Sequence, residues 1–271
     1  MNRSRRLFPI GLLWAAVLLA PAARAAPPET NAPGELRVAY RTDDKPVSFL
    51  QDGQPAGLLI DFMNAVAARL GLRVTYVSTT FAAMVPAVRN HQYDTAAFGV
   101  LVTPERQAVV DFTTPIGYGQ AQLVSRKDAP LARLDDAAGK TVAVTTGSAL
   151  IPLLQQRAPQ VTVKQFPNIA SSINALVSGQ IDGLFTGLAT AERIVEQHPA
   201  LEATQTVESG VTALPVARDR PALRAALDGA IAALMRDGTY TRLNVKWNPP
   251  SMAIPERLYA DYPGMPRPAA R

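Results

Sequence analysis

Apolar residues recur at helical spacing in several segments of the chain, and short apolar runs lie between these segments. In residues 58–70, Leu59, Phe62 and Val66 would share one helix face, and Gly71 would end the helix. The same patterns predict further helices at 82–90, 103–111, 149–157, 169–178 and 221–237, and strands at 36–40, 73–77, 93–102, 120–125, 140–145, 161–165 and 181–185. Strands and helices that alternate in this way predict an α/β fold built on parallel sheets.

One of the predicted helices has an arginine in its first turn, which is an unusual place for a cation. Residues 98–102 form an apolar run typical of a short buried strand, and Thr103 and Pro104 then have the residue types of an N-cap and a first helical position. Arg106 would therefore lie beside unsatisfied N–H groups and the positive end of the helix dipole. Either this side chain points into water, partly balanced by Glu105, or it binds an anion. This segment alone leaves both readings open.

A short pattern occurs twice along the chain, at 91–99 and at 179–187. Each copy has a Gln, an aromatic or aliphatic residue, an Asp, a short apolar run and a final glycine, Gly99 or Gly187. The repeat is short enough to be chance or a common helix–turn–strand solution. If the halves are equivalent, both glycines lie at strand ends, where ligands bind in open α/β sheets. The pattern thus favours a cleft between two lobes, with one glycine on each rim.

Residues 1–25 predict a secretory signal peptide. Three arginines precede the apolar run 7–20, and small residues follow as far as Ala25, where we expect cleavage. The apolar run is short for a membrane anchor, so the mature protein is expected in the periplasm and not anchored in the membrane. Residues 4–8 also resemble a twin-arginine signal, and both that route and the general secretory route stay open.

Removing the signal peptide changes the charge of the chain. The full sequence has a formal net charge of +5, and the four arginines of residues 1–25, which contain no acid, account for most of it. The mature protein is therefore nearly neutral. This excludes nucleic acid and anionic membrane as its main partners.

The sequence gives no sign of a metal site, a cofactor or catalytic residues. It has no cysteine, which excludes disulfides, thiol nucleophiles, zinc thiolates and a lipid anchor on cysteine. His91 and His198 lie far apart in the sequence and do not form a metal-binding pair. No Ser/His/Asp arrangement and no phosphate-binding glycine loop stands out.

A series of motifs, in this order and spacing, resembles family 3 periplasmic solute-binding proteins, the amino-acid receptors of ABC importers. The motifs are GLLIDF at 57–62, FAAMVPAV at 81–88, TPER at 103–106 with DF at 111–112, LDDAAGKTVAVTTG at 134–147, SGQID at 178–182, and DGTY at 237–240 before KW at 246–247. Each motif alone is weak, but together they cover residues 36–247 and are specific.

The resemblance implies a hinged fold of two lobes, each a sheet flanked by helices, with two crossing segments between them. Lobe 1 would combine residues 34–118 with 210–248, and lobe 2 would be 119–209. The proline-rich segment 249–271 is expected to be irregular, and to pack on or trail from lobe 1.

Proteins of this family bind one small solute in the cleft, close on it and deliver it to an inner-membrane ABC permease, without chemistry. The resemblance therefore implies a monomeric binding protein for a small carboxylate-bearing solute, an amino acid or a related organic acid. Two alternatives stay open. Some proteins that resemble this fold are periplasmic cyclohexadienyl dehydratases, and others present their closed form to a signalling receptor.

Several site residues follow from the resemblance. Arg106 would clamp the carboxylate of the solute, and the N–H groups of Gly147 and Ser148 would hold it from the other lobe. Gly99 would offer backbone groups at its strand end, and Phe81 would line the pocket. For Gly147 and Ser148, the alternative is a plain turn and N-cap.

Arg41 falls where acidic-amino-acid receptors of the family place an arginine for the side-chain carboxylate of the solute. The solute would then carry two carboxylates. The alternative is an ordinary exposed charge, and the sequence does not decide between the two.

The chain departs from the family at three positions. Amino-acid receptors usually have a carboxylate at the position of Gly187 for the ammonium group, Ser or Thr at Leu101, and an aromatic residue at Val47. A buried ammonium group without a partner is costly, so these departures favour an acid that lacks a free α-ammonium. Asp43 or Asp44 could supply a substitute carboxylate, or could be residues of a turn.

Overall fold

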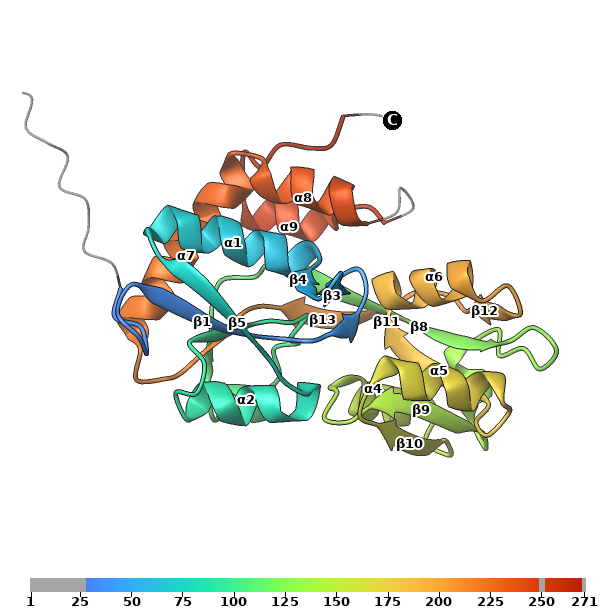
Figure 1. Ribbon diagram of the computed structural model, residues 1–271. Coiled ribbons are helices and arrows are strands. Elements are labelled where there is room, and N and C mark those ends of the chain that lie inside the picture. Colours follow the sequence, from blue (N-terminus) through green and yellow to red (C-terminus); the bar gives the residue numbers. More distant parts are fainter. Residues whose placement is uncertain (1–27, 249–251, 270–271) are drawn as a thin grey trace, which may run out of the picture.

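The computed structural model describes residues 28–248 and 252–269 (Figure 1), so the predicted signal peptide at 1–25 lies outside the described residues. The helices are α1 (Leu58–Leu70), α2 (Phe81–Arg89), α3 (Pro104–Gln107), α4 (Leu150–Arg157), α5 (Ile169–Val177), α6 (Leu188–Gln197), α7 (Pro221–Arg236), α8 (Thr239–Trp247) and α9 (Glu256–Asp261), with a 3₁₀ turn at Leu134–Ala137. The strands are β1 (Glu35–Tyr40), β2 (Asp43–Asp44), β3 (Ser48–Gln51), β4 (Gln54–Ala56), β5 (Arg73–Ser78), β6 (Thr95–Ala97), β7 (Asp111–Phe112), β8 (Gly117–Arg126), β9 (Thr141–Thr145), β10 (Thr162–Phe166), β11 (Gly183–Gly187), β12 (Leu201–Ala203), β13 (Val207–Thr212) and β14 (Pro215–Val216).

The elements form two lobes side by side, which confirms the predicted α/β fold. Lobe 1 contains the parallel sheet β5–β1–β6, with α1, α7 and α8 on one face and α2 on the other (Figure 1). Lobe 2 contains the sheet β10–β9–β11–β8–β12, and β13 also pairs with β8. The antiparallel pair of β8 and β13 passes between the lobes, since Leu101 of lobe 1 bridges to Thr212 of β13. The residue positions that we predict as lobe boundaries stay a prediction.

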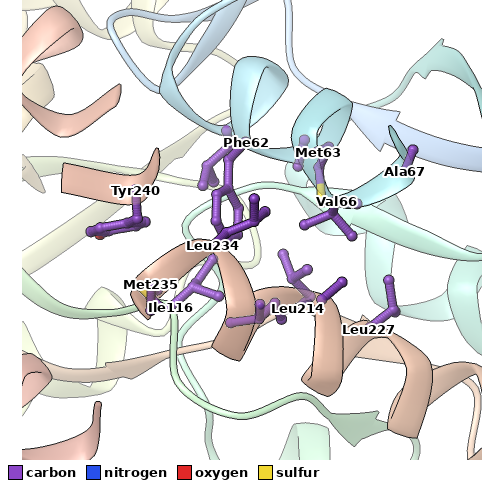
Figure 2. Close-up of a cluster of buried hydrophobic side chains, with 14 of the residues drawn as sticks. Phe62, Met63, Val66, Ala67, Ile116, Leu214, Leu227, Leu234, Met235 and Tyr240 are labelled. Carbon is purple, nitrogen blue, oxygen red and sulfur yellow. The ribbon is translucent and has the colours of Figure 1, made fainter. Parts of the chain in front are cut away.

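The core of lobe 1 forms where α1 packs on α7. Figure 2 shows Phe62, Met63 and Val66 of α1 facing Leu227 and Leu234 of α7. All five are buried. Val66 follows Phe62 by four residues and Met63 by three, and Leu234 follows Leu227 by seven, so the residues of each helix share one face. Burying each such side chain contributes about 1.5–3 kcal/mol. This packing fixes the face of lobe 1 that carries the cleft residues.

In lobe 2 the strand β9, which lies between β10 and β11, separates two apolar clusters. Val142 and Val144 belong to the cluster beneath α4, while Ala143 belongs to the cluster beneath α5 and α6. Successive side chains of a strand point to opposite faces, so a continuous apolar run is what a strand covered on both faces needs.

The repeated sequence pattern corresponds to one local structure in each lobe. The Asp94 carboxylate accepts the N–H of Arg37 at 2.8 Å, and the Asp94 N–H donates to the Arg37 carbonyl at 2.8 Å. Asp182 makes the same two bonds with Thr141, both also 2.8 Å long. In each lobe an aspartate that follows a helix thus ties the next strand to its neighbour.

The strand predicted at 93–102 is wrong in its length, because β6 ends at Ala97. The following residues pair with β13 and the residue after it, in the hinge between the lobes, instead of extending β6. The Val102 N–H donates to the Val211 carbonyl at 2.8 Å, and the Val100 carbonyl accepts the Ala213 N–H at 3.1 Å. This change of partner turns the chain towards the cleft just before Arg106.

The helix predicted at 103–111 is also shorter than expected. Thr103 caps α3 as predicted, since its hydroxyl oxygen accepts the Arg106 N–H at 3.4 Å, and Pro104 is the first helical residue. The helix ends at Gln107, because Asp111 and Phe112 form β7 and pair with β14.

The sequence pattern predicts parallel sheets, but the sheet of lobe 2 is mixed. Its strands β9, β10 and β11 are parallel, but β8 runs antiparallel to β11, β12 and β13. The chain enters the lobe along β8, and β12 and β13, which lead back to lobe 1, pair antiparallel with it.

The C-terminal segment is partly helical, so the prediction of an irregular tail is wrong at Glu256–Asp261. Leu258 and Tyr262 are buried in the core of lobe 1, and the Tyr262 hydroxyl donates to the Pro115 carbonyl at 2.6 Å. The segment therefore packs on lobe 1.

Candidate functional site

A cavity of about 240 Å³ lies between the lobes. Apart from Gly147, every predicted site residue lines it: Arg41, Phe81, Gly99, Leu101, Arg106, Ser148 and Gly187. Much of the remaining wall is apolar: Val47, Leu58, Leu59, Ile116, Ala149, Leu150, Phe185, Leu188 and Ala189. Among the described residues that line the cavity, Asp44 is the one acidic side chain. The cavity thus combines two arginines and one carboxylate with a wall that is partly apolar and partly made of hydroxyl and amide side chains, such as those of Gln120, Thr145 and Ser209.

Arg106 is held in place by backbone carbonyls of both lobes. Its Nη1 donates to the Leu101 carbonyl at 2.7 Å, and its Nη2 donates to the Gly147 carbonyl at 3.0 Å. The guanidinium also lies over the Phe81 ring, with Cζ 5.4 Å from the ring centroid. These contacts fix the orientation of the guanidinium in the cleft.

The charge of Arg106 is not neutralised by a neighbouring carboxylate. Within 28–248 and 252–269, no carboxylate oxygen lies within 4.0 Å of its guanidinium. Burial lowers the pKa of Arg106, and the nearby charge of Glu105 opposes this shift. An anion in the cavity would stabilise this arginine.

Gly147 brings lobe 2 into close contact with the start of α2. Its φ is +77°, and a Cβ atom there would lie 3.0 Å from the Ala82 Cα. The neighbouring Ser148 N–H already donates to the Thr145 carbonyl at 3.0 Å, and the Ser148 hydroxyl oxygen accepts the Leu150 N–H at 3.2 Å. In this arrangement the Ser148 N–H is engaged in its own turn, and Gly147 meets Arg106 through its carbonyl oxygen.

Arg41 is a buried residue of the cleft, with 6% of its surface exposed, so it is not an exposed surface charge. Its Nε donates to Asp43 Oδ1 at 3.0 Å, and its Nη1 lies 3.6 Å from Asp44 Oδ2. Its backbone N–H donates to the Ser48 hydroxyl oxygen at 3.0 Å. Two carboxylates of the same loop therefore neutralise Arg41, in contrast to Arg106.

The sequence did not show that Asp43 and Asp44 contact the other lobe. Asp43 Oδ2 accepts the N–H of Ile169, at the start of α5, at 2.8 Å. Asp44 Oδ1 accepts the hydroxyl hydrogen of Thr190, in α6, at 2.7 Å. The sequence signal is the pair of adjacent acids directly after β1, but pairing them with residues some 125 positions or more away requires the three-dimensional arrangement.

The three departures from the family pattern all face the cavity. Val47, Leu101 and Gly187 line it and bring no polar side chain. A Cβ atom at Gly187 would meet only the Gln120 carbonyl oxygen, at 3.9 Å, so this position has room for a side chain.

Within the part of the chain that the structure describes, no group of three or more His, Asp or Glu residues could hold a metal ion. None of the helices formed by these residues has the length and apolar character needed to cross a lipid bilayer.

The family assignment follows from a sequence comparison. Residues 36–250 match the family described as "Bacterial extracellular solute-binding proteins, family 3". The chain therefore belongs to this family, and the resemblance seen in its motifs is confirmed. Members of this family are extracellular solute-binding proteins.

Characterised relatives cover most of the chain. The ABC transporter arginine-binding protein 1 of Escherichia coli K12 is 28% identical over 202 residues, which is 71% of this chain and 82% of that protein. The L-cystine-binding protein TcyJ of the same strain is 27% identical over 222 residues, 79% of this chain and 82% of that protein.

Solved structures share the fold. An ancestral arginine-binding protein bound to arginine has a TM-score of 0.75 and 29% identity, covering 79% of this chain and 98% of that one. An ancestral amino-acid-binding protein, a precursor of cyclohexadienyl dehydratase, has a TM-score of 0.74 and 28% identity, covering 80% and 96%.

Proposed function

We propose that this protein is the periplasmic solute-binding component of an ABC importer. It binds a small carboxylate-bearing solute between its lobes and delivers it to an inner-membrane permease. The export signal predicted at 1–25 supports the location, and a relative named as an arginine-binding protein of an ABC transporter supports the permease. The protein acts as a monomer and performs no chemistry on the solute.

The observation that carries this proposal is the state of Arg106. It is a half-buried cation at the cavity wall with no protein carboxylate within 4.0 Å among the described residues, and two of its five N–H donors bond to backbone carbonyls. The remaining donors suit a carboxylate, which an arginine binds through two parallel hydrogen bonds. A solute carboxylate would supply the missing negative charge.

The rest of the cavity favours an organic acid over an ordinary amino acid. Gly187 offers no carboxylate for an α-ammonium group, and Asp44 is occupied by Arg41 and Thr190. The apolar wall suits a hydrocarbon body.

A ligand screen tests the proposed function. Purified mature protein is mixed with L-amino acids and small organic acids in a thermal-shift assay, and each hit is measured by calorimetry. We expect one-to-one binding of a carboxylate, and loss of binding when that carboxylate is replaced by its methyl ester. Tight binding of ordinary L-amino acids, matched by no organic acid, would contradict the organic-acid assignment. A ligand that binds equally well as its ester would contradict the role of Arg106.

A dehydratase on the same fold is the second candidate, because one structural neighbour is a precursor of such an enzyme. That chemistry needs an acid in the cleft. The Asp44 carboxylate accepts the Thr190 hydroxyl hydrogen and lies against Arg41, so it serves as an acceptor of hydrogen bonds. We expect no absorbance change with prephenate or arogenate, and turnover of either would establish the enzyme. A sensing role would use the same closed form, and a neighbouring sensor-kinase gene in place of a permease gene would favour it.

A further inference from the structure

We infer that Asp43 and Asp44, held together by Arg41, form a clasp that joins the two lobes, and that the clasp limits the solute to one carboxylate. The inference rests on the proposed function of the cleft. It assigns Arg41 to closure and specificity, in place of a second carboxylate site.

Asp43 and Asp44 belong to lobe 1, and each accepts a hydrogen bond from lobe 2, at 2.8 Å from the Ile169 N–H and at 2.7 Å from the Thr190 hydroxyl. The N–H of Ile169 is one of the groups that a helix start leaves without an intrahelical partner. A carboxylate there is also favoured by the helix dipole. Both bonds exist only while the lobes are close together.

Arg41 contacts both of these acids. With 6% of its surface exposed, it lies between the two carboxylates, bonded to Asp43 at 3.0 Å and 3.6 Å from Asp44. Two adjacent carboxylates repel each other, and a buried cation between them offsets this repulsion. Arg41 thus holds the two acids side by side, with each directed at lobe 2.

The charges of these residues also affect which solute the cavity accepts. Arg41 with Asp43 and Asp44 carries a net charge of −1, whereas Arg106 carries +1 without a carboxylate partner. The cavity wall at Asp44 therefore repels a carboxylate, and the wall at Arg106 attracts one. Arg41 can bind a second solute carboxylate only by giving up the clasp. The site as arranged fits a monocarboxylate.

The closure part of the inference can be tested without any ligand. The chain has no cysteine, so two introduced cysteines are unique labelling sites. Arg89→Cys in α2 and Gln156→Cys in α4 place spin labels on exposed residues of the two helices that flank the Ala82–Gly147 contact. Lobe opening lengthens the distance between these labels, which double electron–electron resonance measures.

We expect a short mean distance in the unliganded wild-type background. The double variant Asp43→Asn/Asp44→Asn should move the distribution to longer distances. Thr190→Val, which removes one clasp bond and leaves every charge in place, should do so in part. Asp52→Asn is the control, since it removes a negative charge from an exposed turn of the same segment. An open unliganded wild type, or unchanged distances in the folded variants, would overturn the clasp.

The specificity part uses pairs of acids that differ by one carboxylate: butyrate and succinate, pentanoate and glutarate. Calorimetry on wild type and Asp44→Asn gives the ratio of affinities within each pair. We expect the wild type to disfavour the dicarboxylates, and Asp44→Asn to gain at least tenfold in dicarboxylate affinity, because Arg41 becomes available. No gain in Asp44→Asn, or dicarboxylate preference in the wild type, would overturn this part.

These outcomes are separate from a failure of the proposed function. If Arg106→Ala retained full carboxylate binding, the solute site would be misplaced, while the label distances would still report on the clasp.

Discussion

Arg106 and Gly147 lie in different lobes and are joined by a hydrogen bond, 3.0 Å long, from the arginine Nη2 to the glycine carbonyl oxygen. The residue that we propose to bind the solute is thus in direct contact with the other lobe. A carboxylate that docks on the remaining donors of Arg106 would be enclosed by this contact. Solute binding and lobe closure therefore share one side chain, which makes them energetically coupled.

Arg106→Ala should abolish measurable solute binding and leave the fold intact. Removing one partner of a desolvated charge pair costs about 2–5 kcal/mol, which is a loss of affinity of about thirtyfold or more. The side chain lies at the cavity wall and is not part of an apolar core. Calorimetry with the best carboxylate of the screen measures the affinity, and circular dichroism the fold.

Arg218→Ala is the matched control for this variant. Arg218 also bonds to a backbone carbonyl beside α3, that of Ala108, but it is exposed and outside the cavity lining. Its removal should leave affinity unchanged. Equal affinities in wild type and Arg106→Ala would show that the solute binds elsewhere.

Gly147→Ala should weaken binding by preventing full closure. Its Cβ would lie 3.0 Å from the Cα of Ala82, and backbone atoms cannot move aside as the end of a flexible side chain does. Gly139→Ala is a close control, because Gly139 has a similar φ of +72° in the same lobe and nothing within 4 Å of the added Cβ.

Both variants should lose about 1–2 kcal/mol of stability from the left-handed backbone conformation. Only Gly147→Ala should also lose affinity, by about tenfold or more, and show a longer distance between the lobes. Similar affinity losses in both variants would attribute the effect to backbone strain alone.

Gly187→Asp should give the protein affinity for ordinary L-amino acids. The position has an extended backbone, with φ −61°, and room for a side chain, so a carboxylate can be installed at the cavity wall. A charge-assisted hydrogen bond contributes about 1.5–3 kcal/mol, which corresponds to a gain of about tenfold to a hundredfold. The neutral Gly187→Asn, of nearly the same shape, should gain much less. Equal gains in both would mean that shape and not charge controls amino-acid binding.

The elements that depend on local patterns could be predicted from the sequence. Helix α1 has the predicted bounds, and Thr103 caps α3 as expected, because apolar spacing and capping act within a few residues. Helix α8 (Thr239–Trp247) was not predicted, since two of its three buried residues, Thr241 and Asn244, are polar and leave no clear apolar pattern in the sequence. Strand β6 is shorter than predicted because the residues after it pair with β13, for example Leu101 with Thr212, and this partner is distant in sequence.

The site residues, too, could be predicted where their role depends on local sequence, and not where it depends on residues far away in the chain. Arg106 could be selected from its helix position and the family motif. The bonds of Asp43 and Asp44 to lobe 2 could not, because they depend on how two lobes meet across residues far apart in the chain. Their effect on Arg41 follows from that arrangement.

The repeated aspartates should differ in their contribution to stability. Asp94 is 4% exposed, and its carboxylate accepts two backbone N–H groups, of Asn31 and Arg37, both at 2.8 Å. Asp182 is only partly buried and its carboxylate accepts one, from Thr141. Leaving a buried donor unpaired costs about 1–3 kcal/mol.

Asp94→Ala should therefore lower the free energy of unfolding by about 2–5 kcal/mol, and Asp182→Ala by about half as much, because one donor is orphaned instead of two. Urea unfolding of the two variants and the wild type, followed by circular dichroism, measures the difference. Asp94→Asn keeps an oxygen acceptor for one of the two donors and should fall between Asp94→Ala and the wild type. An equal loss in Asp94→Ala and Asp182→Ala would mean that burial and the second bond add nothing, and that the two aspartates are equivalent in energy as well as in geometry.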